Sequence, residues 1–312
     1  MDIGEGIMIS MMEQELSAEC PFKVPESDDM EVEKEDAEWD DTTGAEEIQH
    51  NNGGTLGRNL GNASEGKEGT INDFYRYPGA LEADPRDDSS TSSPAKLMRV
   101  LDETDEFPYH VAAHHLIPGE ASLAPSELYT HYMVKDASID IETGAGTKSF
   151  TIGWNIGYNV NGAHNGVWLP GNYALRARFS YKHKYKGQTW EAIADGDFKT
   201  KYSIAAMKKS GNRQFHDAHV PYNEKVLSIL NKMAEKLMVH QAVCEQECKS
   251  KTKLNPPYRV KLRLYEWSGC LKRMVVGNPN SWKYPYFTSG PMGDKFRSSN
   301  AKMLEYYQNT PS

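Results

Sequence analysis

The sequence predicts an α+β fold, in which a body of strands and helices follows an acidic, disordered arm. Charge marks the two parts: residues 1–96 hold 24 of the 44 acidic and 7 of the 35 basic residues, a net charge of −17. The rest of the chain holds 20 acidic and 28 basic residues, a net charge of +8. Within this basic body, residues 109–117 have the composition of a strand, and residues 219–248 repeat apolar side chains at helical spacing.

Residues 1–95 are predicted to be disordered, because they bury too little apolar surface to offset the entropy cost of ordering the chain. Residues 51–54 and 89–94 have the composition of linkers. Residues 7–16 are an exception, since their apolar side chains could form one face of a short helix. Such a helix would serve either as a docking element or as no more than a frayed turn.

The body is predicted to comprise a domain of residues 96–250 and a C-terminal extension of residues 251–312 packed on it. The clearest helix is expected at residues 219–248. The other expected elements are a strand at 109–117, a helix at 123–134, strands around 149–154, a helix at 202–209, a strand at 258–267 and a helix at 292–308. Residues 172–185 fit either a strand or a helix.

Composition narrows the class of protein. No run approaches the roughly 18 apolar residues that a membrane-spanning helix requires, so we expect no membrane partner. The first ten residues lack the basic start of a secretory signal, so we expect synthesis in the cytoplasm without a classical signal peptide. The basic body suits nucleic acid, because neutralising phosphates drives such binding, although ordinary surface charge explains the same excess.

Two adjacent histidines are the most informative feature of the chain. His114 and His115 lie in Ala-His-His-Leu-Ile-Pro, residues 113–118, on the first predicted strand of the body. Neighbouring residues of a strand point to opposite sides of the backbone. One imidazole can therefore bind a metal while the other faces a reacting water.

Two further motifs follow the histidine pair. Asn165-Gly166 is followed by Leu-Pro at residues 169–170. His216 and His219 then enter the clearest helix at i,i+3 spacing, so both side chains can lie on one face.

These motifs, in this order over residues 109–226, resemble the AHH nuclease family of the HNH (ββα-metal) superfamily. The resemblance implies a ββα-metal core with helical insertions and a metal-dependent, non-specific endonuclease that prefers DNA but also accepts RNA. It implies one divalent metal ion, with Mg, Zn, Ni and Mn as candidates. Family members commonly act as toxin effectors that are exported or injected into target cells, which implies a cognate immunity protein as partner.

The resemblance also assigns roles to individual histidines. His115 would be the general base that deprotonates water. The metal ligands would be His114, His216 and His219. Many related nucleases space the last pair by four residues, so Asp217 is a substitute for His216.

Asn165 would orient the base histidine through the second nitrogen of its ring. Gly166 would permit the turn that follows. Asn161 also precedes a glycine and is a competing candidate for the role of Asn165. His164, next to Asn165, is a further candidate participant.

A basic run interleaved with aromatic side chains follows the asparagine motif. Its members are Arg176, Arg178, Lys182, Lys184 and Lys186. Such a run can follow a phosphate backbone, and a solvated strand or helix face would look the same.

Other functions fit parts of the pattern. The alternative from a different class is a non-catalytic nucleic-acid-binding protein whose histidines hold a structural zinc ion, a site that closes with four ligands and leaves no position for water. A third possibility is a housekeeping or defence nuclease. The acidic arm is expected to contact a delivery apparatus or chaperone, or to shield the basic site.

Overall fold

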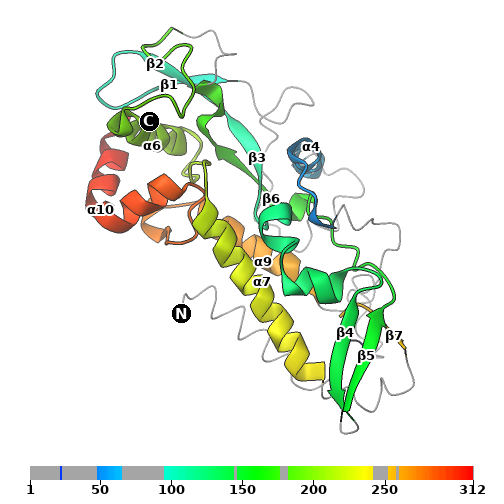
Figure 1. The fold of residues 1–312 in the computed structure, drawn as a ribbon. Coiled ribbons are helices and arrows are strands. Elements are labelled where there is room, and N and C mark those ends of the chain that lie inside the picture. Colours follow the sequence, from blue (N-terminus) through cyan, green and yellow to red (C-terminus); the bar gives the residue numbers. More distant parts are fainter. Residues whose placement is uncertain are drawn as a thin grey trace. The chain divides into compact units, whose positions relative to one another are not determined.

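A computed structural model describes residues 22, 48–64, 95–143, 146–175, 182–241, 252–257 and 260–311. The chain divides into two compact units, each assembled from three segments. Unit 1 comprises Met1–Asn51, Ile117–Asn161 and Val226–Cys270, and unit 2 comprises Asn52–Leu116, Gly162–Lys225 and Leu271–Ser312. Small sheets and several helices occur together, which confirms the α+β prediction (Figure 1). The expected boundaries near residues 95 and 250 remain predictions.

Unit 2 contains two antiparallel strand pairs. β1 (Lys96–Arg99) pairs with β2 (Glu106–Tyr109), and β3 (Val111–His115) pairs with β6 (Gly166–Pro170). In the second pair His115 lies opposite Gly166. The strand predicted at residues 109–117 is therefore confirmed over its central part, and it brings the histidine pair next to the start of β6.

A helix lies where the sequence predicts only disorder. α4 (Gly53–Ser64) lies beside β3 and β6 (Figure 1), and its Leu56 side chain is fully buried. Leu60 lies one helical turn later and packs in the same cluster, which includes Trp168 of β6. Four glycines make the segment look like a linker, but two leucines at i,i+4 spacing suffice to bury one face of the helix. The prediction of disorder is wrong for these residues, and the helix predicted at residues 7–16 lies outside the described part of the chain.

Gly166 allows α4 to pack closely on β6 and does not form a turn. Its backbone is extended, with φ −122°, so the expectation that it permits a tight turn is wrong. A Cβ at this position would lie 2.8 Å from Leu56 Cδ1 and 2.9 Å from Leu60 Cδ1. Glycine is therefore the residue that lets α4 pack closely on the start of β6.

Replacing Leu56 by alanine should lower the free energy of unfolding by about 2–5 kcal/mol, because a fully buried leucine leaves a cavity between α4 and β6. Urea unfolding followed by circular dichroism measures the change. Leu97→Ala is the matched control, since the Leu97 side chain is 46% exposed and should change stability by less than about 0.5 kcal/mol. Equal unfolding midpoints for the two variants would show that α4 does not cover the strands.

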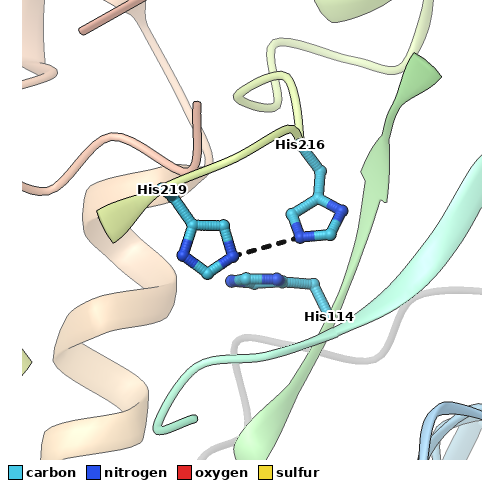
Figure 2. A group of neighbouring side chains, drawn as sticks. All are labelled: His114, His216 and His219. Atoms are coloured by element: carbon cyan, nitrogen blue, oxygen red, sulfur yellow. Dashed lines mark hydrogen bonds between the residues drawn. The ribbon is translucent and has the colours of Figure 1, made fainter. Parts of the chain in front are cut away.

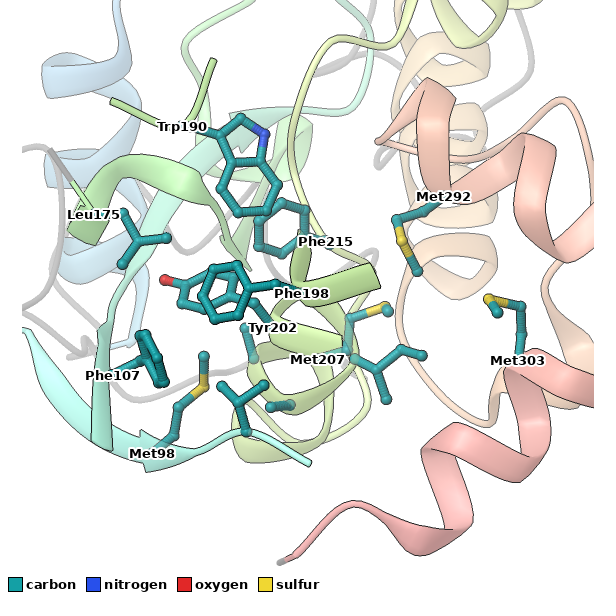
Figure 3. Close-up of a cluster of buried hydrophobic side chains, with 14 of the residues drawn as sticks. Met98, Phe107, Leu175, Trp190, Phe198, Tyr202, Met207, Phe215, Met292 and Met303 are labelled. Atoms are coloured by element: carbon teal, nitrogen blue, oxygen red, sulfur yellow. The ribbon is translucent and has the colours of Figure 1, made fainter. Parts of the chain in front are cut away.

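The main core of unit 2 surrounds α6 (Gly196–Lys209) and α10 (Gly290–Asn309), which confirms the helices predicted at residues 202–209 and 292–308. Asp195 caps α6 by accepting a hydrogen bond from the Phe198 backbone N–H at 2.9 Å. Figure 3 shows Phe215 in this core, and its ring centroid lies 5.5 Å from that of Trp190. Phe215 directly precedes His216, so the core anchors the segment that carries the second histidine pair.

α7 (Val220–Gln241) confirms the clearest predicted helix, while residues 242–248 of that prediction lie outside the described residues. Unit 1 contains β4 (Ser138–Thr143) and β5 (Gly146–Ile152), an antiparallel pair that confirms the strand predicted near residues 149–154. β7 (Lys253–Leu254) pairs in parallel with β5.

Two predictions of local structure need correction. The helix expected at residues 123–134 is broken into two π-helical turns, Gly119–Leu123 and Tyr129–Met133, because Pro125 between them supplies no backbone N–H. The strand expected at residues 258–267 is instead the start of α9 (Val260–Val275). Its buried side chains, Val260, Leu264, Trp267, Leu271 and Val275, recur every three or four residues. Among the described residues, no helix is both long and apolar enough to span a bilayer.

Candidate metal centre

Three imidazoles converge within unit 2. His114 comes from β3, while His216 and His219 come from the segment that leads into α7 (Figure 2). One ring nitrogen of each lies within 4.8 Å of one ring nitrogen of the other two. His216 Nε2 and His219 Nε2 are 3.2 Å apart. The structure thus brings together the three histidines that the resemblance names as ligands.

Backbone hydrogen bonds hold the segment of the second histidine pair on both sides. The His216 N–H donates to the Pro170 carbonyl at the end of β6, at 2.7 Å. The Asp217 N–H donates to the Thr288 carbonyl at 2.9 Å, and the Gly290 N–H donates to the Ala218 carbonyl. The position of the two imidazoles is therefore set by β6 and by the residues that begin α10.

The environment keeps these imidazoles neutral. Burial, together with the neighbouring His219 and His115, lowers the pKa of His216 from 6.5 to about 3. Burial also holds the pKa of His114 well below its usual range and lowers that of His219. Neutral imidazoles keep a nitrogen lone pair, which is the form that binds a metal.

The donor set fits a divalent metal ion. The Nε2 atom of His114 is buried and has no hydrogen-bond partner among the residues that the structure describes. A buried polar atom without a partner is costly, and coordination of a cation would satisfy it. Three imidazole nitrogens within 4.8 Å of one another form a suitable set for such an ion.

The lowered pKa values predict a pH-dependent stability of the metal-free protein. Below the ordinary histidine pKa of 6.5 the unfolded chain takes up protons that the folded site does not. The contribution of these histidines to the free energy of unfolding should therefore be fully present above pH 6.5. It should decrease as the pH falls toward about 3, the pKa of His216. His216 contributes at most about 1.4 kcal/mol per pH unit within this window. Urea unfolding of chelator-treated protein at a series of pH values measures the slope, and His216→Gln should make it shallower; equal slopes would contradict the lowered pKa.

His115 is the last residue of β3, and Asn165 directly precedes β6. His115 is only 9% exposed, and its charge acts on the pKa of both His114 and His216, so it lies near the three-histidine cluster. Asn165 is fully buried in the 3₁₀ turn Ala163–Asn165, and its carbonyl accepts a hydrogen bond from the Leu116 N–H at 2.9 Å. The backbone thus joins Asn165 to the residue that follows His115.

The competing asparagine has a different partner. The Asn161 side-chain amide donates to the His50 carbonyl at 2.9 Å, and both residues belong to unit 1. His164 is 8% exposed in the turn that carries Asn165 and is not a member of the three-histidine group. These placements favour Asn165 for the role that the motif implies.

Asp217 is engaged in hydrogen bonds within the core of unit 2, and its role as a substitute for His216 remains a prediction. Its Oδ2 accepts a hydrogen bond from Trp190 Nε1 at 2.9 Å, and its Oδ1 accepts one from Asn172 Nδ2 at 3.2 Å. The carboxylate is therefore engaged with the core of unit 2. It is absent from the metal-binding group found among the described residues.

The basic run is only partly described. Arg176 and Arg178 lie outside the described residues, while Lys182 and Lys186 are exposed. Lys184 Nζ lies 2.7 Å from Glu103 Oε1, and this hydrogen bond raises the pKa of the lysine. Lys184 thus has a carboxylate partner within the protein, whereas Lys182 and Lys186 present their side chains to solvent.

One contact to the site has no signal in the three motifs. Tyr173, in the 3₁₀ turn Asn172–Leu175 after β6, places its hydroxyl 2.5 Å from His216 Nδ1. A tyrosine in an aromatic, basic stretch looks like a surface residue, and only the return of the chain to β6 brings it to the histidine. Tyr173 therefore touches the site directly, although none of the three sequence motifs indicates it.

Comparison with known proteins agrees with this geometry. Residues 101–255 match the model of AHH, a nuclease family of the HNH/ENDO VII superfamily with conserved AHH. No curated protein and no solved structure shows significant similarity to the chain. The matched segment contains all three motifs and all three convergent histidines. Through this segment, the chain belongs to the AHH nuclease family.

Proposed function

We propose that the chain is a metal-dependent endonuclease that hydrolyses phosphodiester bonds of nucleic acids, with DNA as the preferred substrate. The observation that carries the proposal is the convergence of His114, His216 and His219 beside His115. Hydrolysis needs positive charge on the phosphate, which an ion held by the three histidines would supply, and a base for the attacking water, which is the role proposed for His115. The family match independently favours a nuclease.

His114, His216 and His219 would hold one divalent ion through their ring nitrogens. When bound, the ion would supply positive charge to stabilise the negative charge that develops on the phosphate and the leaving oxygen. An all-imidazole set suits zinc or nickel better than magnesium, which prefers oxygen ligands. Among the candidate metals we therefore favour zinc and nickel.

His115 would act as the general base. It takes a proton from water as the water oxygen attacks phosphorus. The bond from phosphorus to the leaving oxygen breaks, and this oxygen keeps the electron pair and is then protonated by solvent water. The alternation of a strand directs His114 and His115 to opposite sides of β3, so the two residues can hold different roles. Asn165 would fix the orientation of the His115 ring from the adjacent start of β6.

Substrate binding is proposed for the basic residues that follow β6. Lys182 and Lys186 are exposed and can contact phosphates, whereas Lys184 is engaged by Glu103. Arg176 and Arg178 keep the role that the sequence predicts for them. These contacts carry no base recognition, so we propose cleavage without sequence specificity.

The biological role that the resemblance favours is that of a toxin effector with a cognate immunity protein. The acidic N-terminal segment, with a net charge of −17 over residues 1–96, suits a delivery or chaperone contact. Expression should then be toxic to the host, and a neighbouring gene product should relieve the toxicity. Growth without harm would favour a housekeeping or defence nuclease instead.

Plasmid cleavage tests the proposed activity. The purified protein should nick and linearise supercoiled DNA, lose this activity after treatment with a chelator, and regain it when zinc or nickel is added back. The rival reading is a nucleic-acid-binding protein with a structural zinc ion, which needs a fourth protein ligand. The metal-binding group found among the described residues contains three ligands, which would leave a coordination position for water and therefore favours catalysis. Metal-bound protein that binds DNA without cutting it would support the rival.

A further inference from the structure

We propose that Tyr173 is a positioning residue that fixes His216 in its metal-binding orientation. The inference rests on the proposed function, since it assigns a partner to one of the three proposed ligands. Three observations carry it: a short contact to one nitrogen of His216, the direction of the other nitrogen, and a glycine that makes room for the tyrosine ring.

The two nitrogens of His216 face different partners. Nδ1 lies 2.5 Å from the Tyr173 hydroxyl oxygen, whereas Nε2 lies 3.2 Å from His219 Nε2 within the cluster (Figure 2). A neutral imidazole carries its hydrogen on only one nitrogen. If Nδ1 carries it, the N–H donates to the tyrosine oxygen and the lone pair of Nε2 points into the cluster.

This arrangement selects the tautomer that a metal requires. The opposite tautomer would direct an N–H from His216 at the position where the proposed ion has to bind. A hydrogen bond to the outward nitrogen of a ligating histidine also fixes the plane of its ring. The Tyr173 oxygen is well placed for both effects.

The surroundings hold the tyrosine ring in place. A Cβ at Gly171 would lie 2.7 Å from Tyr173 Cε2, so the ring occupies space that only glycine leaves open. The ring centroid of His110 lies 5.7 Å away in an edge-on arrangement. The Gly171 backbone also bridges to His216, so both partners of the contact are attached to the same short segment.

Tyr173→Phe removes the hydroxyl and keeps the ring. Zinc affinity, measured by competition with a chromophoric chelator, should fall roughly 10–100-fold, as for loss of other outer-shell partners of metal ligands. Tyr202→Phe is the matched control, because its buried hydroxyl donates to the Pro108 carbonyl at 2.7 Å and contacts no histidine of the cluster. This control should bind zinc as tightly as the wild type.

A second variant disrupts the contact between Tyr173 and His216 without removing the hydroxyl. Gly171→Ala should push the tyrosine ring away from His216 and lower the zinc affinity. In the Tyr173→Phe background it should add little, since the contact is already lost. This keeps the inference testable if either single variant folds poorly.

A metal-free measurement separates positioning from general stability. In protein with ¹⁵N-labelled histidine, His216 should be the Nδ1–H tautomer in the wild type and a mixture in Tyr173→Phe. Unchanged tautomer populations together with unchanged zinc affinity in Tyr173→Phe would overturn the inference. A wild-type protein that binds no zinc or nickel at all would instead refute the proposed metal site, so the two failures are distinguishable.

Discussion

Replacing His115 by alanine should abolish plasmid cleavage while leaving the fold and the metal site intact. A general base contributes roughly a hundred- to ten-thousand-fold in rate, and His115 lies beside the three-histidine cluster without belonging to it. Cleavage rates at saturating metal, together with thermal unfolding and zinc titration of the same preparation, separate catalysis from folding and binding.

The matched control for this prediction is His131→Ala. His131 is exposed in unit 1, where its Nδ1 can donate a hydrogen bond to the Ser138 carbonyl at 3.2 Å. Its loss should leave the cleavage rate within about twofold of the wild type, as for ordinary surface substitutions. A folded His115→Ala protein that cuts as fast as this control would remove His115 from the reaction.

Replacing His114 by alanine should remove both metal binding and cleavage. His114 supplies the only proposed ligand from β3, and one of its ring nitrogens lies within 4.8 Å of a ring nitrogen of each of the other two histidines. Loss of a direct ligand should exceed the roughly 10–100-fold that loss of an outer-shell partner costs. Zinc titration and plasmid cleavage of the purified variant measure the two effects.

Asp217→Asn provides the contrast for the ligand prediction. It changes a carboxylate next to His216 that holds Trp190 and Asn172, so it should lower the free energy of unfolding by about 1–3 kcal/mol. Zinc affinity should change by less than tenfold. A larger loss of zinc in Asp217→Asn than in His114→Ala would show that the ligand set is misassigned.

The candidate site was predictable because its residue types are unusual at their spacing. A histidine pair on a strand and a second pair at the start of a helix point to one centre, and the structure brings His114, His216 and His219 together across about a hundred residues of chain. His115 and Asn165 are 50 positions apart in the sequence. The pairing of β3 with β6 nevertheless brings them close together, because it places His115 opposite Gly166.

What could not be predicted depends on tertiary packing. The segment of α4 is rich in glycine, and its helix is stabilised by burial of Leu56 and Leu60 against β6 rather than by its own propensity. Alternation of Val260 with later apolar residues suggested a strand, yet in α9 the buried side chains follow helical spacing. Tyr173 contacts His216 only because the segment that carries His216 lies alongside Gly171, the residue that follows β6.

The most direct test of the account is anomalous diffraction from a crystal of the protein loaded with zinc, recorded at the zinc absorption edge. We expect one peak among His114, His216 and His219, within about 2.0–2.3 Å of one nitrogen of each, and with an open position for water. A fourth protein ligand that closes the site would favour the structural zinc protein. No peak among the three imidazoles, or a peak elsewhere in the protein, would contradict the central claim.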